Sequence, residues 1–338
     1  MRAIEIQGSF GLDNLTIAER EEPAVGAGQI KLKMKAVSLN YRDLLMVQGK
    51  YDPRQPLPLI PCSDGVGEVV EVGEGVSRVV VGDRVCPIFA QRWLSGEPTH
   101  EKLRSTLGSP FDGTLTQTMV LSAEGVVKVP SHLTDAEAAA LPCAALTAWS
   151  ALVTLGNVKA GDSVLVQGTG GVSIFALQFA KLLGARVFVT SSSDEKLERV
   201  TQMGADEVVN YRTVPKWGKE IRGRTGRVGV DHIIEVGGAG TLQQSLQAIR
   251  IGGHISLIGV LSGGVSDLNI LPLVMSQVKV QGLVVGSREG FEAMNKAIEV
   301  NQMKPVVDKV FPFEQAQDAF EYLAAGKHFG KVCIEIPA

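Results

Sequence analysis

The sequence predicts an α/β protein that combines a β-rich domain with a doubly wound parallel sheet. Three observations carry this prediction. Residues 1 to about 123 contain short runs of alternating apolar and polar side chains, joined by Gly and Pro turns. From residue 135 onward, helix-like and strand-like segments alternate, as they do in a parallel sheet covered on both faces. A length of 338 residues fits two domains of about 100–200 residues each.

The first half is predicted to consist of short strands in a compact barrel or sandwich. Residues 29–37 alternate apolar and polar side chains, as a half-buried strand does. Further strands are expected over 65–73 and 79–85. Residues 91–114 show no periodicity and carry mixed charges, so we expect an exposed insertion or lid there.

The second half is predicted to alternate between strands and helices. A helix starts over 135–141, is interrupted by Pro142 and resumes over 144–155. Strands are then expected at 163–167, 186–190, 207–209, 230–235, 253–259 and 279–285, with helices at 172–183, 194–203, about 215–224 and 240–250. After about residue 287, a helix over 289–300 and strands over 306–311 and 331–336 are expected to return to the first domain.

A glycine turn joins the strand 163–167 to the helix that follows it. Gly168 allows a tight turn, and Gly170 lets a pyrophosphate approach the backbone at the helix N-terminus. Ser173 stands where the GxGxxG fingerprint has its third glycine. The other interpretation is an ordinary glycine-rich turn. The predicted cofactor-binding residues here are Gly168, Gly170, Gly171 and Val172.

The strand 186–190 ends in hydroxyl side chains instead of the carboxylate that usually binds the adenosine ribose. Ser191, Ser192 and Lys196 would accept a 2′-phosphate, so the sequence favours NADP(H) over NAD(H). The run of three serines at 191–193, followed by Asp194 and Glu195, could equally cap a helix. Tyr211, after the next strand, is predicted to flank the adenosine.

Composition and charge exclude several classes of function. A formal net charge of −3 without a basic stripe argues against a nucleic-acid partner. No apolar run approaches 18 residues, and the run that starts at Met1 lacks the apolar stretch of a signal peptide, so no membrane association is expected. The four cysteines have no CxxC spacing and are expected to be reduced thiols in a cytoplasmic protein.

Several motifs, in order and spacing, carry a resemblance to a known family. They lie at 37–43, 49–51, 61–69, 81–85, 138–142, 146–148, 168–173, 183–185, 210–212 and 330–332. With these residues the chain resembles the medium-chain dehydrogenase/reductase superfamily, in its zinc-free quinone oxidoreductase-like branch, whose members are often labelled alcohol dehydrogenases. The resemblance implies a GroES-like β-barrel catalytic domain from 1–144 and 287–338, and an inserted Rossmann NADP-binding domain over 145–286.

The resemblance also bears on zinc. Zinc-dependent members use a Cys, the His of a Gly-His-Glu motif and a further Cys or Asp, and the matching positions here are Asn40, Ser63 and Cys143. Asn and Ser are poor zinc ligands, and one thiolate cannot hold a catalytic zinc ion. The Glu of the motif is Asp64. No catalytic metal is therefore expected.

Without a metal, hydrogen-bond donors must polarise the oxygen of the substrate as hydride arrives. The resemblance places Asn40 and Tyr51 near the nicotinamide, and Tyr51 matches the proton donor of zinc-free enoyl reductases. The alternative is that Tyr51 only packs beside the cofactor and that Asn40 makes a turn hydrogen bond. Arg42 and Asp43 are expected to form a structural ion pair at a helix start.

Four further cofactor contacts are predicted. The resemblance places Thr147 beside the nicotinamide and makes Lys331 a candidate. Leu261 and Gly286 follow later strands, at the carboxyl edge where doubly wound sheets bind ligands.

Taken together with the residues, the resemblance implies hydride transfer from NADPH to a small molecule, either a quinone or an α,β-unsaturated carbonyl compound. The alternatives are a metal-free NAD(P)-dependent alcohol or aldehyde dehydrogenase and a non-catalytic NADP(H)-binding protein or redox sensor. The substrate itself depends on loops such as 91–112. The resemblance further implies a homodimer, with contact through the apolar edge strand 278–285.

Overall fold

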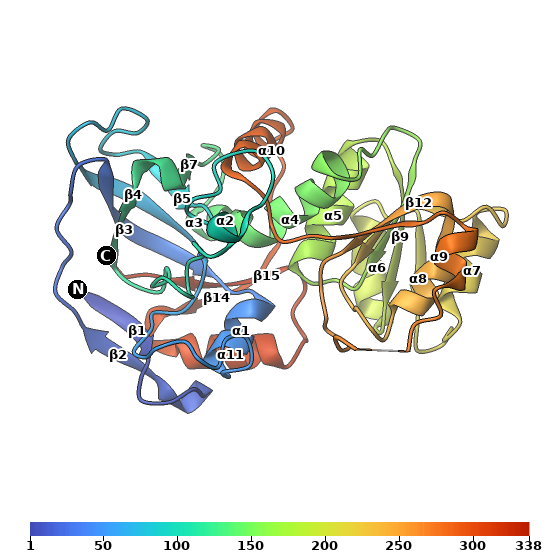
Figure 1. Ribbon diagram of the computed structural model, residues 1–338, viewed down its shortest axis with the longest axis horizontal. Helices are drawn as coiled ribbons and strands as arrows, with labels where there is room; N and C mark the ends of the chain where they lie inside the picture. Colours follow the sequence, from blue (N-terminus) through green and yellow to red (C-terminus); the bar gives the residue numbers. More distant parts are fainter. Residues whose placement is uncertain (266, 338) are drawn as a thin grey trace. The chain divides into compact units, whose positions relative to one another are not determined.

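The computed structural model describes all residues except 266 and 338. The chain forms two compact units. The first unit comprises Met1–Leu146 together with Val285–Ala338, and the second comprises Thr147–Val284 (Figure 1). Among the described residues, no helix combines the length and the apolar character needed to cross a membrane.

The first unit is built around β3 (Gln29–Ser38), whose side chains alternate between buried and half-exposed over most of its length. It pairs antiparallel with β4 (Asp64–Val72), β6 (Thr118–Ser122) and β15 (Lys331–Glu335). Over the described chain the order is β14–β15–β3–β4–β5–β7, with β6 also on β3. The remaining strands are β14 (Val307–Pro312), β5 (Arg84–Pro87), β7 (Val126–Lys128), and the separate pair of β1 (Arg2–Ile6) and β2 (Leu15–Glu19).

Several helices follow or pack on the strands of this unit. α1 (Tyr41–Val47) follows β3, and the Asp43 carboxylate accepts a hydrogen bond from the Asn40 N–H at 2.8 Å, which fixes the helix start. α11 packs on β14 and β15. The other helices are α2 (His100–Leu103), α3 (Asp135–Ala139), α10 (Arg288–Val300) and α11 (Ala316–Ala324). The helix expected over 144–155 is instead a series of short pieces, which are two π-helical turns, Leu141–Ala145 and Ser150–Thr154, on either side of α4 (Leu146–Trp149).

The prediction of a strand over 79–85 was wrong for residues 79–83. Only β5 pairs, and Val80 and Val81 are exposed by 61% and 59%. The Asp83 carboxylate accepts a hydrogen bond from the Val80 N–H at 2.8 Å, so residues 80–83 form a turn. The apolar run is real, but the local hydrogen bond of an Asp competes with strand pairing.

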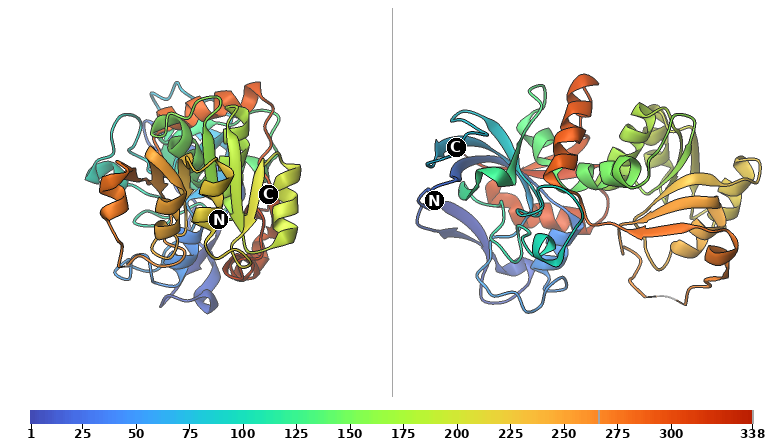
Figure 2. Two further views of the ribbon diagram at one scale, coloured as in Figure 1. Left: turned by 90° about the vertical axis from the view of Figure 1, so that its right-hand side faces the viewer. Right: turned by 45° about the horizontal axis from the view of Figure 1, so that its top comes forward.

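The second unit, coloured from green to orange in Figure 2, contains a sheet and helices. The sheet is parallel, with the strand order β10–β9–β8–β11–β12–β13. The order reverses between β8 and β11, which is the arrangement of dinucleotide-binding sheets. The strands are β8 (Ser163–Gln167), β9 (Arg186–Ser191), β10 (Glu207–Asn210), β11 (Val230–Glu235), β12 (Ile249–Leu257) and β13 (Lys279–Gly282).

Helices follow the strands as expected from the alternation. α5 and α6 pack on β8, β9 and β10, while α7 and α8 pack on one another and on β10, β11 and β12. Trp149 makes an edge-to-face contact with Phe179 of α5, with ring centroids 5.4 Å apart. The helices are α5 (Gly171–Leu182), α6 (Asp194–Gln202), α7 (Trp217–Arg224), α8 (Leu242–Ala248) and α9 (Leu271–Met275).

Several boundaries in this unit differ from the expectation, and two of them show the reason. β12 starts at Ile249, where a helix was expected to continue to residue 250, because Ile249 pairs with Val230 ahead of an irregularity in the register. β13 ends at Gly282, three residues before the expected end at 285. Propensity over a few residues does not fix where pairing starts or stops.

Candidate active site

The glycine turn of the second unit has the geometry of an anion-binding helix start. Gly168 has a φ of +72°, which favours glycine, and its N–H donates to Thr190 O on the neighbouring strand at 2.7 Å. Gly170 is the N-cap of α5 and provides no side chain to satisfy the first N–H groups of the helix. These groups can therefore bind a phosphate.

Ser173 replaces the third glycine of the GxGxxG fingerprint, and its contacts explain why a serine fits there. Its buried hydroxyl donates to Gln167 O at 2.6 Å, so the side chain ties the first turn of α5 to the end of β8. A third glycine would allow close packing at this point, and the serine fills the same space with a hydrogen bond. The Ser173 hydrogen bond thus fixes the turn, while Gly170 leaves the N–H groups at the helix start free of a side chain.

The carboxylate of Glu235, which the sequence-based predictions do not include, is fully buried at the end of β11, beside the reversal of strand order. It accepts five hydrogen bonds, from the N–H groups of Gly237 and Gly238 and from the side chains of Gln167, Thr241 and Ser245. A buried charge needs such partners. Glu235 therefore fixes the loop that leaves the carboxyl edge of the sheet. An acidic residue that ends a buried strand and precedes two glycines was the available signal.

At the end of β9, the serines have structural roles of their own. Ser193 caps α6 by accepting a hydrogen bond from Lys196 N at 3.3 Å, and the buried Ser191 hydroxyl accepts from Ser193 N at 3.3 Å. The helix-cap interpretation thus holds for Ser193. Contacts of Ser191, Ser192 and Lys196 with a phosphate, and of the half-exposed Tyr211 with adenosine, stay predictions.

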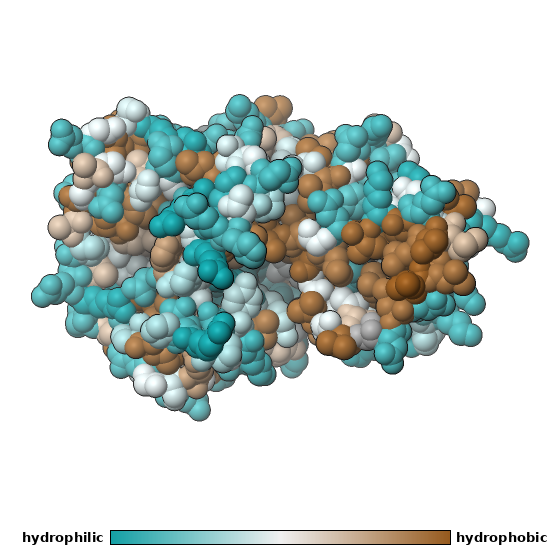
Figure 3. All heavy atoms as spheres, in the orientation of Figure 1, coloured by the Kyte–Doolittle hydropathy of each residue, from teal (hydrophilic) through white to brown (hydrophobic). Residues whose placement is uncertain are grey.

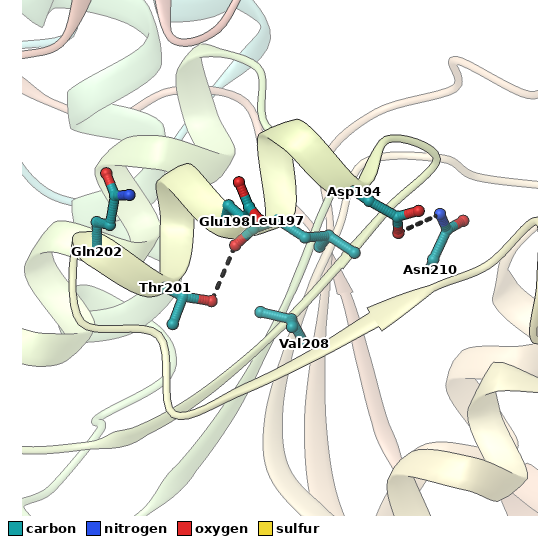
Figure 4. Close-up of a pocket in the computed structure, with 7 residues that line it drawn as sticks. All are labelled: Asp194, Leu197, Glu198, Thr201, Gln202, Val208 and Asn210. Atoms are coloured by element: carbon teal, nitrogen blue, oxygen red, sulfur yellow. Dashed lines mark hydrogen bonds between the residues drawn. The ribbon is translucent and has the colours of Figure 1, made fainter.

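A groove lies between α6 and β10 in the second unit (Figure 4). Its lining comprises Asp194, Leu197, Glu198, Thr201, Gln202, Val208 and Asn210. At the end nearest the α6 N-terminus, Asn210 Nδ2 donates to Asp194 Oδ1 at 2.7 Å. The Asp194 carboxylate lies three positions after Ser191 and is held by Asn210, and it adds negative charge beside the predicted 2′-phosphate contacts.

The remaining predicted cofactor contacts are divided between the two units. Thr147 is buried in α4, and Leu261 is exposed by 54% after β12, both within the second unit. Gly286 and Lys331 belong to the first unit. Their joint use by one cofactor stays a prediction.

In the first unit, residues far apart in the sequence form a buried polar cluster, which consists of Asn40, Asp43, Asp64 and Lys331. The Lys331 side chain is only 3% exposed, and its Nζ donates to Asn40 Oδ1 at 2.6 Å and to Leu39 O at 2.7 Å. Asn40 and Lys331 were predicted as separate site residues, and the hydrogen bond between them was not predicted.

Asp64 is the fully buried anion of the polar cluster. Its carboxylate accepts hydrogen bonds from the Ser63 hydroxyl at 2.8 Å and the Cys143 N–H at 3.0 Å. Burial raises the pKa of Asp64, while the Lys331 charge and the nearby Asn40 amide oppose that rise.

Asp43 is the second buried carboxyl group of the polar cluster. Burial is the main cause that raises its pKa from 3.8 to about 6, with the Arg42 charge acting in the opposite direction. The expected Arg42–Asp43 ion pair is present at 3.8 Å at the start of α1.

Tyr51 lies beyond the other end of α1, and it is 51% exposed. The Arg42 guanidinium lies 4.9 Å from the centre of its ring and donates to Leu107 O and Ser109 O, at 2.8 Å each. These contacts give the Tyr51 ring a fixed neighbour while half of the side chain stays exposed. The two predicted catalytic side chains thus come from opposite ends of one short helix.

The residues at this site do not fit a zinc ion. The Asn40 amide oxygen already accepts from an ammonium group, and Cys143 has its thiol pKa raised, mainly by burial and also by Asp64. A protonated thiol is a poor metal ligand. In the part of the chain that the structure describes, no three His, Cys, Asp or Glu side chains gather as a metal site.

Comparisons with known proteins agree with this two-part architecture. Residues 26–131 match the family model for the alcohol dehydrogenase GroES-like domain, and residues 171–300 match that for zinc-binding dehydrogenases. A zinc-type alcohol dehydrogenase-like protein of Schizosaccharomyces pombe is 43% identical over 96% of both chains. An acryloyl-coenzyme A reductase of Metallosphaera sedula is 29% identical over 99% of both chains.

Solved structures show the same fold. A structure described as an NAD-dependent alcohol dehydrogenase superposes with a TM-score of 0.92, at 33% identity over all of both chains. A mycobacterial protein solved with NADPH superposes with a TM-score of 0.84, at 28% identity over 99% of this chain and 100% of that chain. A GroES-like unit joined to a dinucleotide-binding sheet defines a class of oxidoreductases. The chain belongs to the medium-chain dehydrogenase/reductase superfamily.

Proposed function

We propose that the protein is a zinc-independent, NADPH-dependent reductase that transfers hydride to a quinone or to an α,β-unsaturated carbonyl compound. The observation that carries the proposal is the polar cluster, where Asn40 matches the position of a metal ligand in zinc-dependent members and its amide oxygen accepts a hydrogen bond from the Lys331 ammonium. Donors of this kind suit an acceptor that needs only modest polarisation of its oxygen. The alkene substrate in the name of the Metallosphaera relative supports the second substrate class.

The predicted residues divide the chemistry among them. When bound, the nicotinamide supplies a hydride from C4. As the hydride reaches the electrophilic carbon, the electron pair of the double bond moves toward the substrate oxygen. The Asn40 amide donates a hydrogen bond to this oxygen, and the half-exposed Tyr51 hydroxyl gives up the proton that completes the product. A quinone can also take its protons from water.

NADPH is the proposed cofactor because the end of β9 offers the Ser191 and Ser192 hydroxyls in place of a carboxylate. Asp194 works against this choice through its negative charge, and it is partly offset by its hydrogen bond to Asn210. The relative solved with NADPH supports the proposal, and the one described as NAD-dependent supports the alternative. Titration of protein fluorescence with NADPH and NADH decides between them. Tighter binding of NADH would overturn the proposal.

A metal-free alcohol or aldehyde dehydrogenase is the second candidate, favoured by the names of the relatives. Three parallel assays separate the candidates, with NADPH oxidation followed for a simple quinone, an enone or acyl-thioester enoate, and an aldehyde. We expect turnover with the first or the second and not with the aldehyde. NADPH binding without turnover in any assay would favour a non-catalytic binding protein. The same assays after dialysis against a chelator, with zinc analysis of the protein, test metal independence, and loss of activity on zinc removal would refute it.

We further propose that the protein is a homodimer that pairs through β13. This strand is one edge of the parallel sheet, and all four of its residues are exposed. The preceding helix α9 exposes Leu271, Val274 and Met275 by 60–71%. Figure 3 shows apolar side chains gathered over this part of the second unit. An unpaired edge with apolar neighbours suits the same strand of a second copy.

The mass of the protein in solution tests this arrangement. We expect a dimer by light scattering, and a Val280→Lys variant should shift toward the monomer. A wild-type monomer at micromolar concentration would overturn the proposal. The four free cysteines support the further proposal that the protein works in the reducing cytoplasm.

A further inference from the structure

Lys331 is an unusual residue because it is a charged side chain buried almost completely. Its ammonium is held by Leu39 O and Asn40 Oδ1, at 2.7 Å and 2.6 Å, and it lies near the buried Asp64. Burying a charge is costly unless it is paired and hydrogen bonded, and both conditions are met here. Two hydrogens of the ammonium are used on acceptors, one of which is a side chain predicted to be catalytic.

The contact with Lys331 fixes which way the Asn40 amide faces. Oδ1 accepts from the ammonium, so the amide cannot rotate by 180° without placing its NH2 group against a buried cation. Asn40 Nδ2 is buried and makes no hydrogen bond that meets normal geometry within the described residues. Its proximity nevertheless lowers the pKa of Asp64. Asn40 therefore stands between a cation and an anion: one N–H of its amide faces the Asp64 carboxylate, and the other N–H is left for a further acceptor.

We propose that Lys331 is a positioning residue that fixes Asn40 as a hydrogen-bond donor and supplies the permanent positive charge of the site. The inference rests on the proposed function, because the acceptor of the Asn40 N–H would be the oxygen of the substrate. It differs from the sequence-based prediction that Lys331 contacts the cofactor. A cofactor contact would act on the affinity for NADPH, whereas a positioning residue acts on the rate of hydride transfer.

A double-mutant cycle separates these roles. Lys331→Met should lower kcat by about 10²-fold, the size of effect seen when an oriented donor is lost, while the Kd for NADPH changes by less than about threefold. Asn40→Ala should lower kcat by a similar factor, and the double variant should be no slower than the slower single variant. Lys331→Arg should recover part of the rate. Lys309→Met, on the neighbouring strand β14, removes a lysine charge outside the polar cluster and should keep the wild-type rate.

Two results would overturn the inference. Multiplicative effects in the double variant would mean that Lys331 and Asn40 act independently. A raised Kd for NADPH with unchanged kcat would mean that Lys331 contacts the cofactor. If Lys331→Met does not fold, the cycle is run in an Asp64→Asn background, which removes the unpaired buried charge, and the same two results decide.

A measurement that needs no turnover tests the geometry separately from the proposed function. The side-chain amide signals of Asn40, assigned by their loss in Asn40→Ala, should exchange their protons slowly in the wild-type protein. In Lys331→Met the exchange should accelerate by at least about tenfold, because the amide is released from its acceptor contact. Unchanged exchange would refute the positioning role. Slow exchange in a wild-type protein that turns over no acceptor would leave the positioning intact and overturn the proposed function alone.

Discussion

Replacing Asp43 by asparagine should stabilise the protein at neutral and alkaline pH. Asp43 is 1% exposed, and burial raises its pKa from 3.8 to about 6. A tenfold change in proton affinity corresponds to about 1.4 kcal/mol, so keeping this carboxylate ionised costs the folded state at most about 3 kcal/mol. The asparagine side chain of this variant would keep an oxygen to accept the Asn40 N–H without carrying the charge.

The pH dependence of the Asp43 contribution to stability follows from the direction of its pKa shift. The folded state binds more protons than the unfolded state between pH 3.8 and about 6, so the Asp43 contribution to stability falls as pH rises through that window. Above it, the cost of the ionised group is complete. Arg42 loses its ion-pair partner in the variant but keeps its two carbonyl acceptors, which reduces the expected gain to about 1–3 kcal/mol.

Urea denaturation of the wild type and Asp43→Asn at several pH values from 4 to 8 measures this contribution. The difference in the free energy of unfolding should be close to zero near pH 4, should grow up to pH 6 and should then stay constant. Groups shared by both proteins cancel in the difference. Glu19→Gln, at an exposed position of β2, serves as the control and should show no such profile. A variant that is less stable than the wild type at pH 8, or a difference that is independent of pH, would refute the reasoning.

Three further predictions follow from other features. Gly113→Ala should destabilise the protein by more than about 2 kcal/mol in thermal denaturation, because the added Cβ would lie 2.1 Å from a backbone carbonyl oxygen. Gly223→Ala in α7, where nothing lies within 4 Å of the added Cβ, is the control and should be neutral or stabilising. Equal effects of the two substitutions would contradict the steric argument. Ser173→Gly should lower the free energy of unfolding by about 1 kcal/mol, because one hydrogen bond is lost, and it should change the Kd for NADPH by less than about threefold. A larger loss of affinity would show that the Ser173 hydroxyl also contacts the cofactor. Burial lowers the pKa values of His232 and His254, so the unfolded state binds more protons and the free energy of unfolding should fall as pH drops below 6.5. A variant with Gln at both positions should lose this part of the acid sensitivity in chemical denaturation. An unchanged pH profile in the variant would count against a role of these two histidines.

The sequence predicted the parts of the fold that local patterns determine. Alternation of strands and helices led to the parallel sheet, and the glycine turn was placed correctly at the start of α5. Local patterns failed where a short-range hydrogen bond competes, as at Asp83, and where register decides, as at Ile249. Both failures concern where an element starts or ends, which depends on partners far along the chain.

The site was harder to predict because its contacts are long-range. Lys331 and Asn40 are 291 positions apart, and Gln167 and Glu235 are 68 apart. The sequence separation of such pairs does not indicate that their side chains are in contact. Residue types alone could indicate that Asn40 and Ser63 are poor metal ligands. They could not show that a lysine supplies the positive charge in the same cluster, because its position depends on β15 pairing with β3.

The order of the strands in the first sheet has a consequence for how the chain matures during synthesis. β3 is made early, but its neighbour β15 leaves the ribosome only after the whole second unit. Until then Asp43 and Asp64 have no ammonium partner, and the nascent first unit must keep them hydrated or protonated. β15 thus completes both the sheet and the charge balance, so a chain that stops before Lys331 lacks the lysine cation of its own polar cluster.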